Sequence, residues 1–341
     1  MAATFGLRGL VRLVGARRGP HRPNHRGGGI RHGGPVVSTT IRVGTRGSRL
    51  ALVQADIVIG LLGERLGLDA RTEVITTSGD RESASSTTTR PPQAGAFVKE
   101  IERALLEDRI DVAVHSYKDL PTELPPGLVI AAVPVRARPE DVLVFAERED
   151  LERVRDSLAS GFGVPDLRIG TGSPRRSHQL VHAIDCEMVP IRGNVTTRLS
   201  RIEDVRRHRE VDAICIARAG IERLGIEPAH VLELPIGRFP TAAGQGAIAL
   251  ETRKGTELES RIAELDDPDA RLTSESERAF LREIDAGCLT PVGTHASVSG
   301  GRIHLLAEVF LPGDRRFRTT VEMVAPFLAG EVAGKRYQRW L

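Results

Sequence analysis

The sequence predicts an α/β fold built from two similar lobes that enclose a cleft. Its 341 residues are enough for two or three domains, each with its own hydrophobic core. Residues 168–175 (Arg-Ile-Gly-Thr-Gly-Ser-Pro-Arg) echo residues 42–49, and residues 212–217 echo residues 111–116. Because both segments have the same order of strand, Gly-Thr turn and helix, the repetition indicates two α/β lobes rather than one large sheet.

Residues 1–40 are predicted to be a disordered extension that lies outside the fold. They contain seven Arg and no Asp or Glu, which is typical of an organelle transit peptide, although an over-long start in a GC-rich genome would have the same composition. These arginines exceed the whole-chain net charge of +3, so the folded body is mildly acidic. A nucleic-acid-binding surface needs its positive charge on the folded domain, and we expect no nucleic-acid partner.

The first lobe is predicted to combine residues 41–139 with residues 241–264. Ser48 should cap a helix that has apolar residues on one face and stops at Gly67. The other predicted elements are strands at residues 41–44, 73–77, 111–114, 128–133 and 248–250 and a helix at residues 97–106. Residues 81–95 have no apolar periodicity and are predicted to be a disordered loop or a lid.

The second lobe is predicted at residues 140–240. Its strands are expected at residues 142–146, 188–191 and 213–217. Ser173 should cap a helix that has Pro174 at its first position.

Polar residues crowd the end of the predicted strand 111–114. His115, Ser116, Lys118 and Asp119 follow it directly, before Pro121 ends regular structure. Open α/β sheets bind their ligands at the carboxyl ends of strands. A single carboxylate beside a single lysine is more often an ion pair that holds a loop, so this segment alone does not establish a site.

Arginines follow three Gly-flanked strand-to-helix turns. Arg46 lies in the first lobe, Arg175 and Arg176 follow Ser173, and Gly193 is flanked by arginines in the segment 192–198. Any one arginine is ordinarily a solvated surface residue, but the repeated placement favours a cleft that grips carboxylate or phosphate groups. The sequence has no Walker A or GxGxxG motif after a strand, so the sequence predicts a multiply anionic ligand and gives no support for a nucleotide.

The three cysteines are scattered and predict a reducing compartment. Cys186, Cys215 and Cys288 show no CxxC spacing, which argues against a disulfide framework or a zinc site, and we expect no metal. Cys215 lies in an apolar run and is predicted to be a core residue. Cys288 instead lies in a loop after a helix, where no apolar periodicity requires it.

Six spaced motifs, in order from about residue 41 to the C-terminus, resemble the hydroxymethylbilane synthase family, also called porphobilinogen deaminase. They are Gly-Thr-Arg-Gly-Ser around Arg46 and the segments 115–122, 170–176, 192–198, 243–247 and 287–293. In this family two periplasmic-binding-protein-like lobes face a cleft, and a smaller third α/β domain carries the cofactor cysteine. The resemblance implies that the third domain is residues 267–341, with a helix at 271–284 and strands at 303–310 and 317–324.

The resemblance also implies the activity of the chain. The family condenses four porphobilinogen molecules head to tail, losing ammonia at each step, to give 1-hydroxymethylbilane for porphyrin (haem and chlorophyll) biosynthesis. Each pyrrole carries acetate and propionate groups, which agrees with an arginine-lined cleft in an acidic body. Cys288 matches the residue that holds the dipyrromethane primer through a thioether, and Asp119 matches the catalytic carboxylate.

Further residues match positions that bind carboxylates in this family. For the cofactor they are Lys118, Ser116, Thr171, Ser173, Arg175, Arg176 and Gln245, and for the substrate they are Arg46, Ser48, Arg192 and Arg198.

Three departures from the family pattern lie in the loop, at the hinge and at residue 218. Ala94 stands where a lysine is common, the charges of residues 136–141 are swapped, and Arg218 replaces a small residue. The altered loop and hinge would favour a catalytically weakened paralogue. Because the fold alone does not decide the function, a non-catalytic solute-binding module of the same fold is a second alternative. We expect a monomer without a membrane partner, located in the cytoplasm, or in a plastid or mitochondrion if residues 1–40 are a transit peptide.

Overall fold

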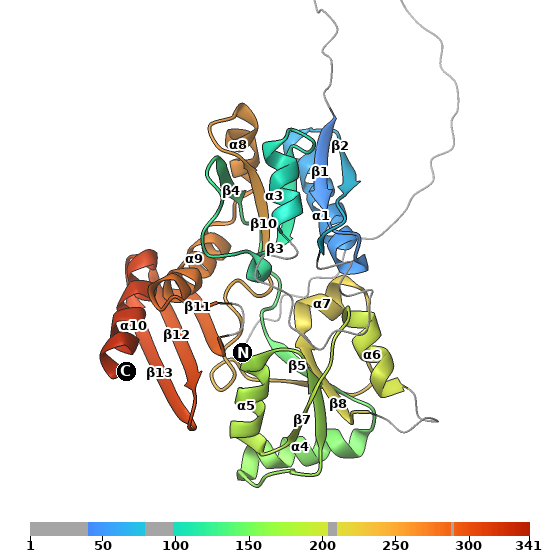
Figure 1. Ribbon diagram of the computed structural model, residues 1–341, viewed down its shortest axis with the longest axis vertical. Coiled ribbons are helices and arrows are strands. Elements are labelled where there is room, and N and C mark those ends of the chain that lie inside the picture. Colours follow the sequence, from blue (N-terminus) through green and yellow to red (C-terminus); the bar gives the residue numbers. More distant parts are fainter. Residues whose placement is uncertain (1–39, 79–97, 204–209, 288–289) are drawn as a thin grey trace, which may run out of the picture. The chain divides into compact units, whose positions relative to one another are not determined.

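The computed structural model describes residues 40–78, 98–203, 210–287 and 290–341. The predictions for residues 1–39, for the loop 81–95 and for Cys288 fall outside these residues. The described chain contains two five-stranded sheets and one three-stranded sheet (Figure 1). Across the described ranges, every helix is too short or too polar to span a bilayer.

The first lobe is built on a mixed sheet with strand order β2-β1-β3-β10-β4. β2 and β3 run parallel to β1, whereas β10 is antiparallel to both of its neighbours. The strands are β1 (Ile41–Thr45), β2 (Ala70–Val74), β3 (Val112–Ser116), β4 (Leu128–Ala132) and β10 (Ile248–Arg253). The helices are α1 (Arg49–Leu66), α3 (Lys99–Leu106), η1 (Tyr117–Asp119), α8 (Glu257–Ile262) and η2 (Ala263–Leu265).

Most elements of the first lobe lie where the sequence predicts them. Ser48 caps α1 by accepting from Ala51 N, and Gly67 ends the helix with a φ of +63°. The prediction for β2 was wrong by three residues. The predicted strand was centred on the apolar pair Val74 and Ile75. Pairing with β1 instead begins at Ala70 and ends at Val74.

The second lobe repeats this arrangement with strand order β7-β6-β8-β5-β9. β6, β7 and β8 are parallel, and β5 is antiparallel to β8 and β9. The strands are β5 (Asp141–Phe145), β6 (Arg168–Thr171), β7 (Glu187–Pro190), β8 (Ala213–Ala217) and β9 (Val231–Glu233), and the helices are α4 (Arg148–Ser160), α5 (Pro174–Ile184), α6 (Val195–Glu203) and α7 (Arg218–Arg223). The chain enters the antiparallel strand of each sheet directly from the other lobe, because β5 follows β4 and β10 follows β9.

The repeated residues form the same ion pair in both lobes. Arg42 Nη2 lies 2.7 Å from Asp111 Oδ1, and Arg168 Nη2 lies 2.9 Å from Asp212 Oδ1. Each pair joins the first parallel strand to the chain that leads into the central strand. The internal repetition therefore has a structural cause, and the predicted α/β class with two similar lobes is confirmed.

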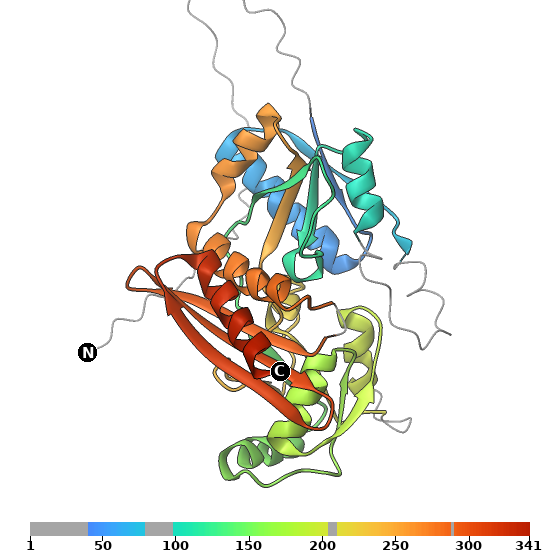
Figure 2. The same cartoon turned by 60° about the vertical axis from the view of Figure 1, so that its left-hand side comes forward.

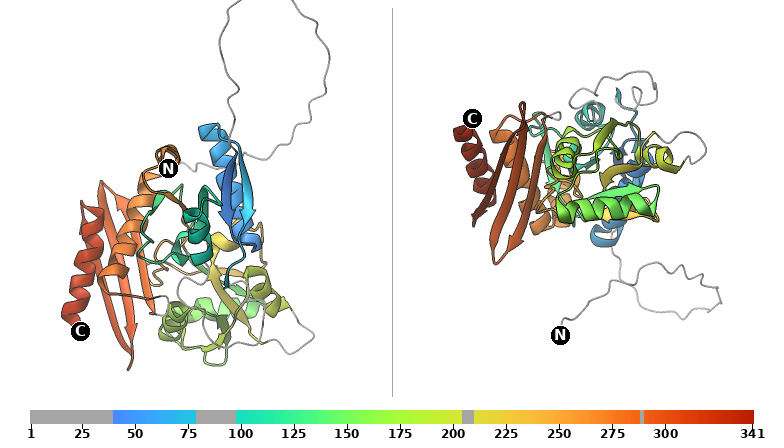
Figure 3. Two further views of the ribbon diagram at one scale, coloured as in Figure 1. Left: turned by 45° about the horizontal axis from the view of Figure 1, so that its top comes forward. Right: turned by 90° about the horizontal axis from the view of Figure 1, so that it is seen from below.

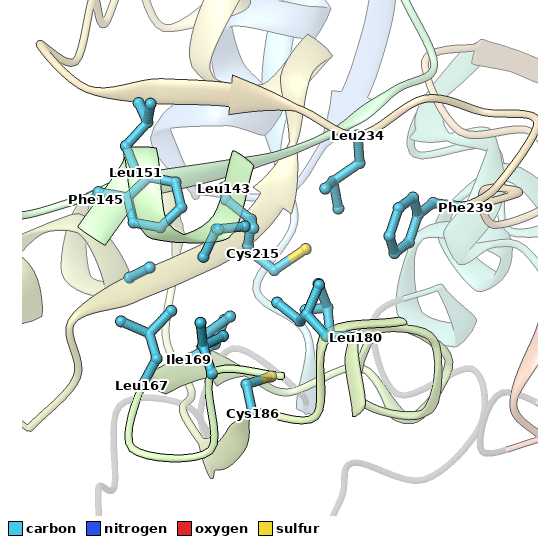
Figure 4. Packing of buried hydrophobic residues seen from close by; sticks show 14 residues of the cluster. Leu143, Phe145, Leu151, Leu167, Ile169, Leu180, Cys186, Cys215, Leu234 and Phe239 are labelled. Carbon is cyan, nitrogen blue, oxygen red and sulfur yellow. The ribbon is translucent and has the colours of Figure 1, made fainter. Parts of the chain in front are cut away.

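Alternation along the strands places a core on each face of the second sheet. Leu143 and Cys215 pack with apolar residues of α4 and α5 (Figure 4), whereas Val142 and Ile214 pack with residues of α6 and α7. Cys215 is fully buried, which confirms the prediction that it is a core residue.

The third domain is an antiparallel sheet covered by two helices (Figures 2 and 3). Its elements are α9 (Pro268–Glu283), β11 (Val292–Ser299), β12 (Arg302–Leu311), β13 (Arg315–Met323) and α10 (Pro326–Trp340). The predicted helix and two strands are confirmed, and β11 is an additional strand. The smaller third α/β domain of the expected fold is therefore also confirmed.

The segment that crosses from the first lobe to the second is tied to the third domain. Arg136 donates through Nη1 and Nη2 to the two carboxylate oxygens of Glu277 on α9, both at 3.0 Å. Glu277 is fully buried, and it also accepts from Gly244 N at 2.7 Å and from Ala296 N at 2.8 Å. The carboxylate of Glu277 thus joins the crossover segment at Arg136, the turn at Gly244 and strand β11.

Candidate active site

The carboxyl end of β3 carries Asp119 on the short helix η1. Asp119 is exposed, whereas the preceding Ser116 is half-buried and accepts from Gln54 Nε2 at 3.0 Å. Asp119 and Ser116 line a pocket of about 80 Å³ together with Arg46 and Ser48 from the turn after β1. The structure therefore brings four of the residues singled out in the sequence to the carboxyl ends of two neighbouring parallel strands.

Gln245 is buried and forms hydrogen bonds to residues of both lobes. Its Oε1 accepts from Lys118 Nζ at 3.4 Å and from Arg176 Nη2 at 3.3 Å, and its Nε2 donates to Asp141 Oδ1 at 2.8 Å. Gly246 follows with a φ of +88°, and a Cβ there would lie 2.3 Å from Ala137 O, so the turn requires glycine. Burial, reinforced by the positive charge of Arg176, lowers the pKa of Lys118 to about 8.

Arg175 and Arg176 share one buried carboxylate. Ser173 caps α5, and Arg175 Nη1 donates to Asp141 Oδ2 at 2.7 Å, while Arg176 donates to Asp141 Oδ1 through Nε and Nη2. Burial alone would raise the pKa of Asp141, but the two guanidinium groups hold it well below its usual range. The arginines therefore bring positive charge to the site, and each already binds a carboxylate of the protein.

Asp141 binds three of the predicted site residues and was not itself predicted from the sequence. It is the first residue of a strand whose other members are all buried and apolar. A single Asp in an otherwise apolar strand could have predicted a cationic partner, because a buried carboxylate needs one.

Thr171 and Arg198 are two further predicted residues of the second lobe. Thr171 is buried, and its Oγ1 accepts from Ser173 N at 3.2 Å. Arg198 donates to Gly193 O at 2.8 Å; burial and the charge of Arg176 lower its pKa to about 10, while the negative charge of Asp119 opposes that shift. Lys118 of the first lobe and Arg176 of the second lobe both donate to Gln245 Oε1, so the two lobes share one charged region.

Arg192 is exposed in the turn before α6. Arg46 lines the same pocket as Asp119. Cys288 cannot be compared with these residues because it lies outside the described residues, but its flanking chain is described up to Gly287 and again from Thr290.

A buried acidic cluster behind β3 was not predicted. His115 Nε2 lies 3.0 Å from Glu251 Oε2, and both side chains are buried. Glu102 on α3 is buried nearby; burial and then the charge of Glu251 raise its pKa to about 7, and His115 opposes the shift. Within the described ranges, Glu102 Oε1 and Glu251 Oε1 accept no hydrogen bond.

Comparison with known proteins gives two family matches that together span most of the chain. Residues 41–260 match the family model described as porphobilinogen deaminase, dipyromethane cofactor binding domain, and residues 271–336 match porphobilinogen deaminase, C-terminal domain. Among similar proteins, the porphobilinogen deaminase of Cutibacterium acnes is 39% identical over 86% of this chain and 89% of its own length. The porphobilinogen deaminase of Mycobacterium avium is 42% identical over 76% of this chain and 77% of its own length.

Among solved structures, the chain is similar to an ancestral cationic amino acid solute binding protein. The likeness has a TM-score of 0.41 at 13% identity and covers 66% of this chain and 87% of that chain.

Proposed function

This chain belongs to the porphobilinogen deaminase family, and we propose that it condenses four porphobilinogen molecules through the charged region around Asp119. The product would be the linear 1-hydroxymethylbilane, with one ammonia lost at each condensation. The observation that carries this proposal is that Lys118, the neighbour of Asp119 in the first lobe, and Arg176 of the second lobe both donate to Gln245 Oε1 in one region rich in cations. Porphobilinogen deaminase relatives that match most of the chain favour this function over a solute-binding module or a weakened paralogue.

The cofactor of this family is dipyrromethane, and the residues present fit it. The group carries several carboxylates, and Lys118, Arg176 and Arg198 bring three cations to the region, while Arg46 lines the pocket beside Asp119. Ser173 and Thr171 add hydroxyl groups at the N-terminus of α5, where backbone N–H groups also favour anions. When bound, the cofactor supplies the pyrrole terminus to which each new unit is joined.

We assign the catalytic role to Asp119. Positive charge develops on a pyrrole as ammonia leaves, and a carboxylate that faces the ring nitrogen stabilises this charge and can accept a proton. Asp119 suits this role because its side chain is exposed at the pocket, whereas Asp141 is buried and held by two arginines.

We assign the attachment of the cofactor to Cys288. Thioether formation requires a thiolate, and burial raises the pKa of the Cys186 and Cys215 thiols to about 12. Both of these thiols also lie in the core of the second lobe. Cys288 is the remaining cysteine of the chain.

We assign carboxylate binding to residues of both lobes. Those proposed for the cofactor are Lys118, Ser116, Thr171, Ser173, Arg175, Arg176 and Gln245, and those proposed for the substrate are Arg46, Ser48, Arg192 and Arg198. Because Arg175 and Arg176 already bind Asp141, we propose that they act on the cofactor through their charge and their remaining N–H groups. Porphobilinogen is a small molecule, and we propose that a monomeric cytoplasmic protein binds it without a nucleic-acid or membrane partner.

Intact-protein mass spectrometry tests the proposal. Wild-type protein should carry a mass increment equal to dipyrromethane, give a coloured product with Ehrlich's reagent and release ammonia from porphobilinogen. Cys288→Ser should lack the increment, whereas Cys186→Ser should retain it because Cys186 is buried elsewhere. Wild-type protein without increment and without turnover would refute the function, and an increment that persists in Cys288→Ser would refute the attachment site.

A further inference from the structure

Helix α9 holds the turn that carries Asp119 at several points. The side chain of Tyr117, the first residue of η1, is fully buried, and its hydroxyl donates to Glu275 Oε1 on α9. One turn further along the helix, Arg278 Nη1 donates to Leu120 O at 3.1 Å and Nη2 donates to Pro121 O. The Arg278 guanidinium also lies 4.6 Å from the centroid of the Tyr117 ring. Two residues of one helix therefore hold both ends of the turn.

These contacts are shielded from water, which makes the link stiff. Arg278 is 4% exposed, so its bonds to the two carbonyl groups do not compete with solvent. Burial, reinforced by the negative charge of Glu275, raises the pKa of Tyr117 above its usual value, so the hydroxyl remains a donor. The second oxygen of Glu275 lies 3.7 Å from Arg282 Nη1, so each oxygen of this carboxylate has a partner.

The same helix leads directly into the segment that contains Cys288. After α9 ends at Glu283, Ala286 N donates back to Leu281 O at 3.0 Å. On the far side of the segment, β11 is bound to α9 because Ala296 N donates to Glu277 Oε1 at 2.8 Å. Both flanks of the Cys288 segment are thus anchored to the helix that also holds the Asp119 turn.

We propose that Tyr117 is a positioning residue, which through Glu275 holds the turn that carries the Asp119 carboxylate in its catalytic position. This inference rests on the proposed function. A carboxylate that acts on one pyrrole nitrogen must be held in a fixed place, and the contacts from α9 fix the Asp119 turn at both of its ends. A displacement of about 1 Å in such a geometry can cost roughly 100-fold in rate.

Tyr117→Phe is the direct test, because it removes one hydroxyl group and leaves the ring under Arg278. We expect kcat to fall about 10- to 100-fold, while KM changes less than about twofold and the dipyrromethane increment stays complete. Tyr337→Phe is the matched control. Tyr337 is the other tyrosine of the chain and lies on α10 of the third domain. The centroid of its ring lies 5.3 Å from that of Phe317, and its hydroxyl forms no hydrogen bond within the described ranges. This control should keep the wild-type kcat.

Variants of Glu275 separate positioning from folding. Glu275→Gln keeps an oxygen that can accept from the Tyr117 hydroxyl and should retain a kcat near that of wild type. Glu275→Ala removes the acceptor and should reproduce the loss seen in Tyr117→Phe, and the double variant Tyr117→Phe/Glu275→Ala should be no slower than either single variant.

A wild-type kcat in Tyr117→Phe would overturn the inference. So would an equal loss in Glu275→Gln and Glu275→Ala, or a loss in Tyr117→Phe that only parallels lower primer occupancy. These outcomes differ from failure of the proposed function, because that failure would appear in wild-type protein as the absence of primer and turnover.

Discussion

Arg176 and Asp141 form a buried ion pair in which Nε and Nη2 of the arginine donate to the same carboxylate oxygen, at 3.0 and 2.6 Å. Arg175 binds the other oxygen at 2.7 Å. The two arginines at the N-terminus of α5 are therefore oriented by β5, whose first residue supplies the carboxylate. This relationship fixes the positive charge of the second lobe before any ligand binds.

Asp141→Asn should destabilise the protein, because it leaves two buried guanidinium groups without a counter-charge. We expect a loss of about 3–5 kcal/mol in the free energy of unfolding, measured by urea denaturation. The control is Asp166→Asn, since Asp166 pairs with Arg153 at 2.6 Å with a side chain that is 70% exposed. That variant should lose less than about 1 kcal/mol. Equal losses in the two variants would contradict the role of burial.

Glu102→Gln should stabilise the protein in a pH-dependent way. The pKa of Glu102 is raised to about 7, so between its ordinary value and pH 7 the folded state binds more protons than the unfolded state. Wild-type stability should therefore fall as the pH rises through this range. The advantage of the variant should be small near pH 5 and reach about 1–3 kcal/mol above pH 7.

The pH series of unfolding experiments has an internal control in Glu107→Gln. Glu107 is the C-cap of the same helix, and hydrogen bonds from Arg103 and Arg109 lower its pKa. This variant should gain no stability as the pH rises. An advantage of Glu102→Gln that does not depend on pH would show that the carboxylate carries no raised pKa.

Gly330→Ala should destabilise the third domain, because α9 and α10 approach closely at this position. An added Cβ would lie 2.5 Å from Ser276 O and 2.6 Å from Phe280 N, both of which are backbone atoms. We expect a loss of about 1–3 kcal/mol by urea denaturation. Gly60→Ala in α1 is the matched helical control, since no atom lies within 4 Å of the added Cβ, and it should gain up to about 1 kcal/mol. A neutral Gly330→Ala would contradict the close helix packing.

The sequence predicts those parts of the fold that local signals encode. Ser48, Gly67 and Ser173 have cap positions that follow from their own chemistry, and the repeated segments encode the same Arg–Asp pair in both lobes. Helix α4 was not assigned, although Leu151, Val154 and Leu158 have helical spacing and pack in the core of the second lobe. There the high charge of the helix obscured its apolar face.

The contacts within the candidate site are less predictable, because they join residues far apart in the chain. Asp141 precedes its partner Arg175 by 34 residues, and Tyr117 precedes Glu275 by 158. Sequence patterns identify Arg175 and Arg176 as cations beside a helix N-terminus, but only the tertiary structure shows that each already binds a carboxylate. The position of β2 was wrong for a related reason, since an edge strand is determined by pairing rather than by apolar alternation.

The intact mass of Asp119→Asn, measured before and after porphobilinogen is added, tests directly whether Asp119 is the catalytic carboxylate. We expect this variant to carry the dipyrromethane increment but to gain almost no further pyrrole units, while wild-type protein under the same conditions shows a series of added units. Elongation in Asp119→Asn at the wild-type rate would contradict the assignment of Asp119 as the catalytic carboxylate.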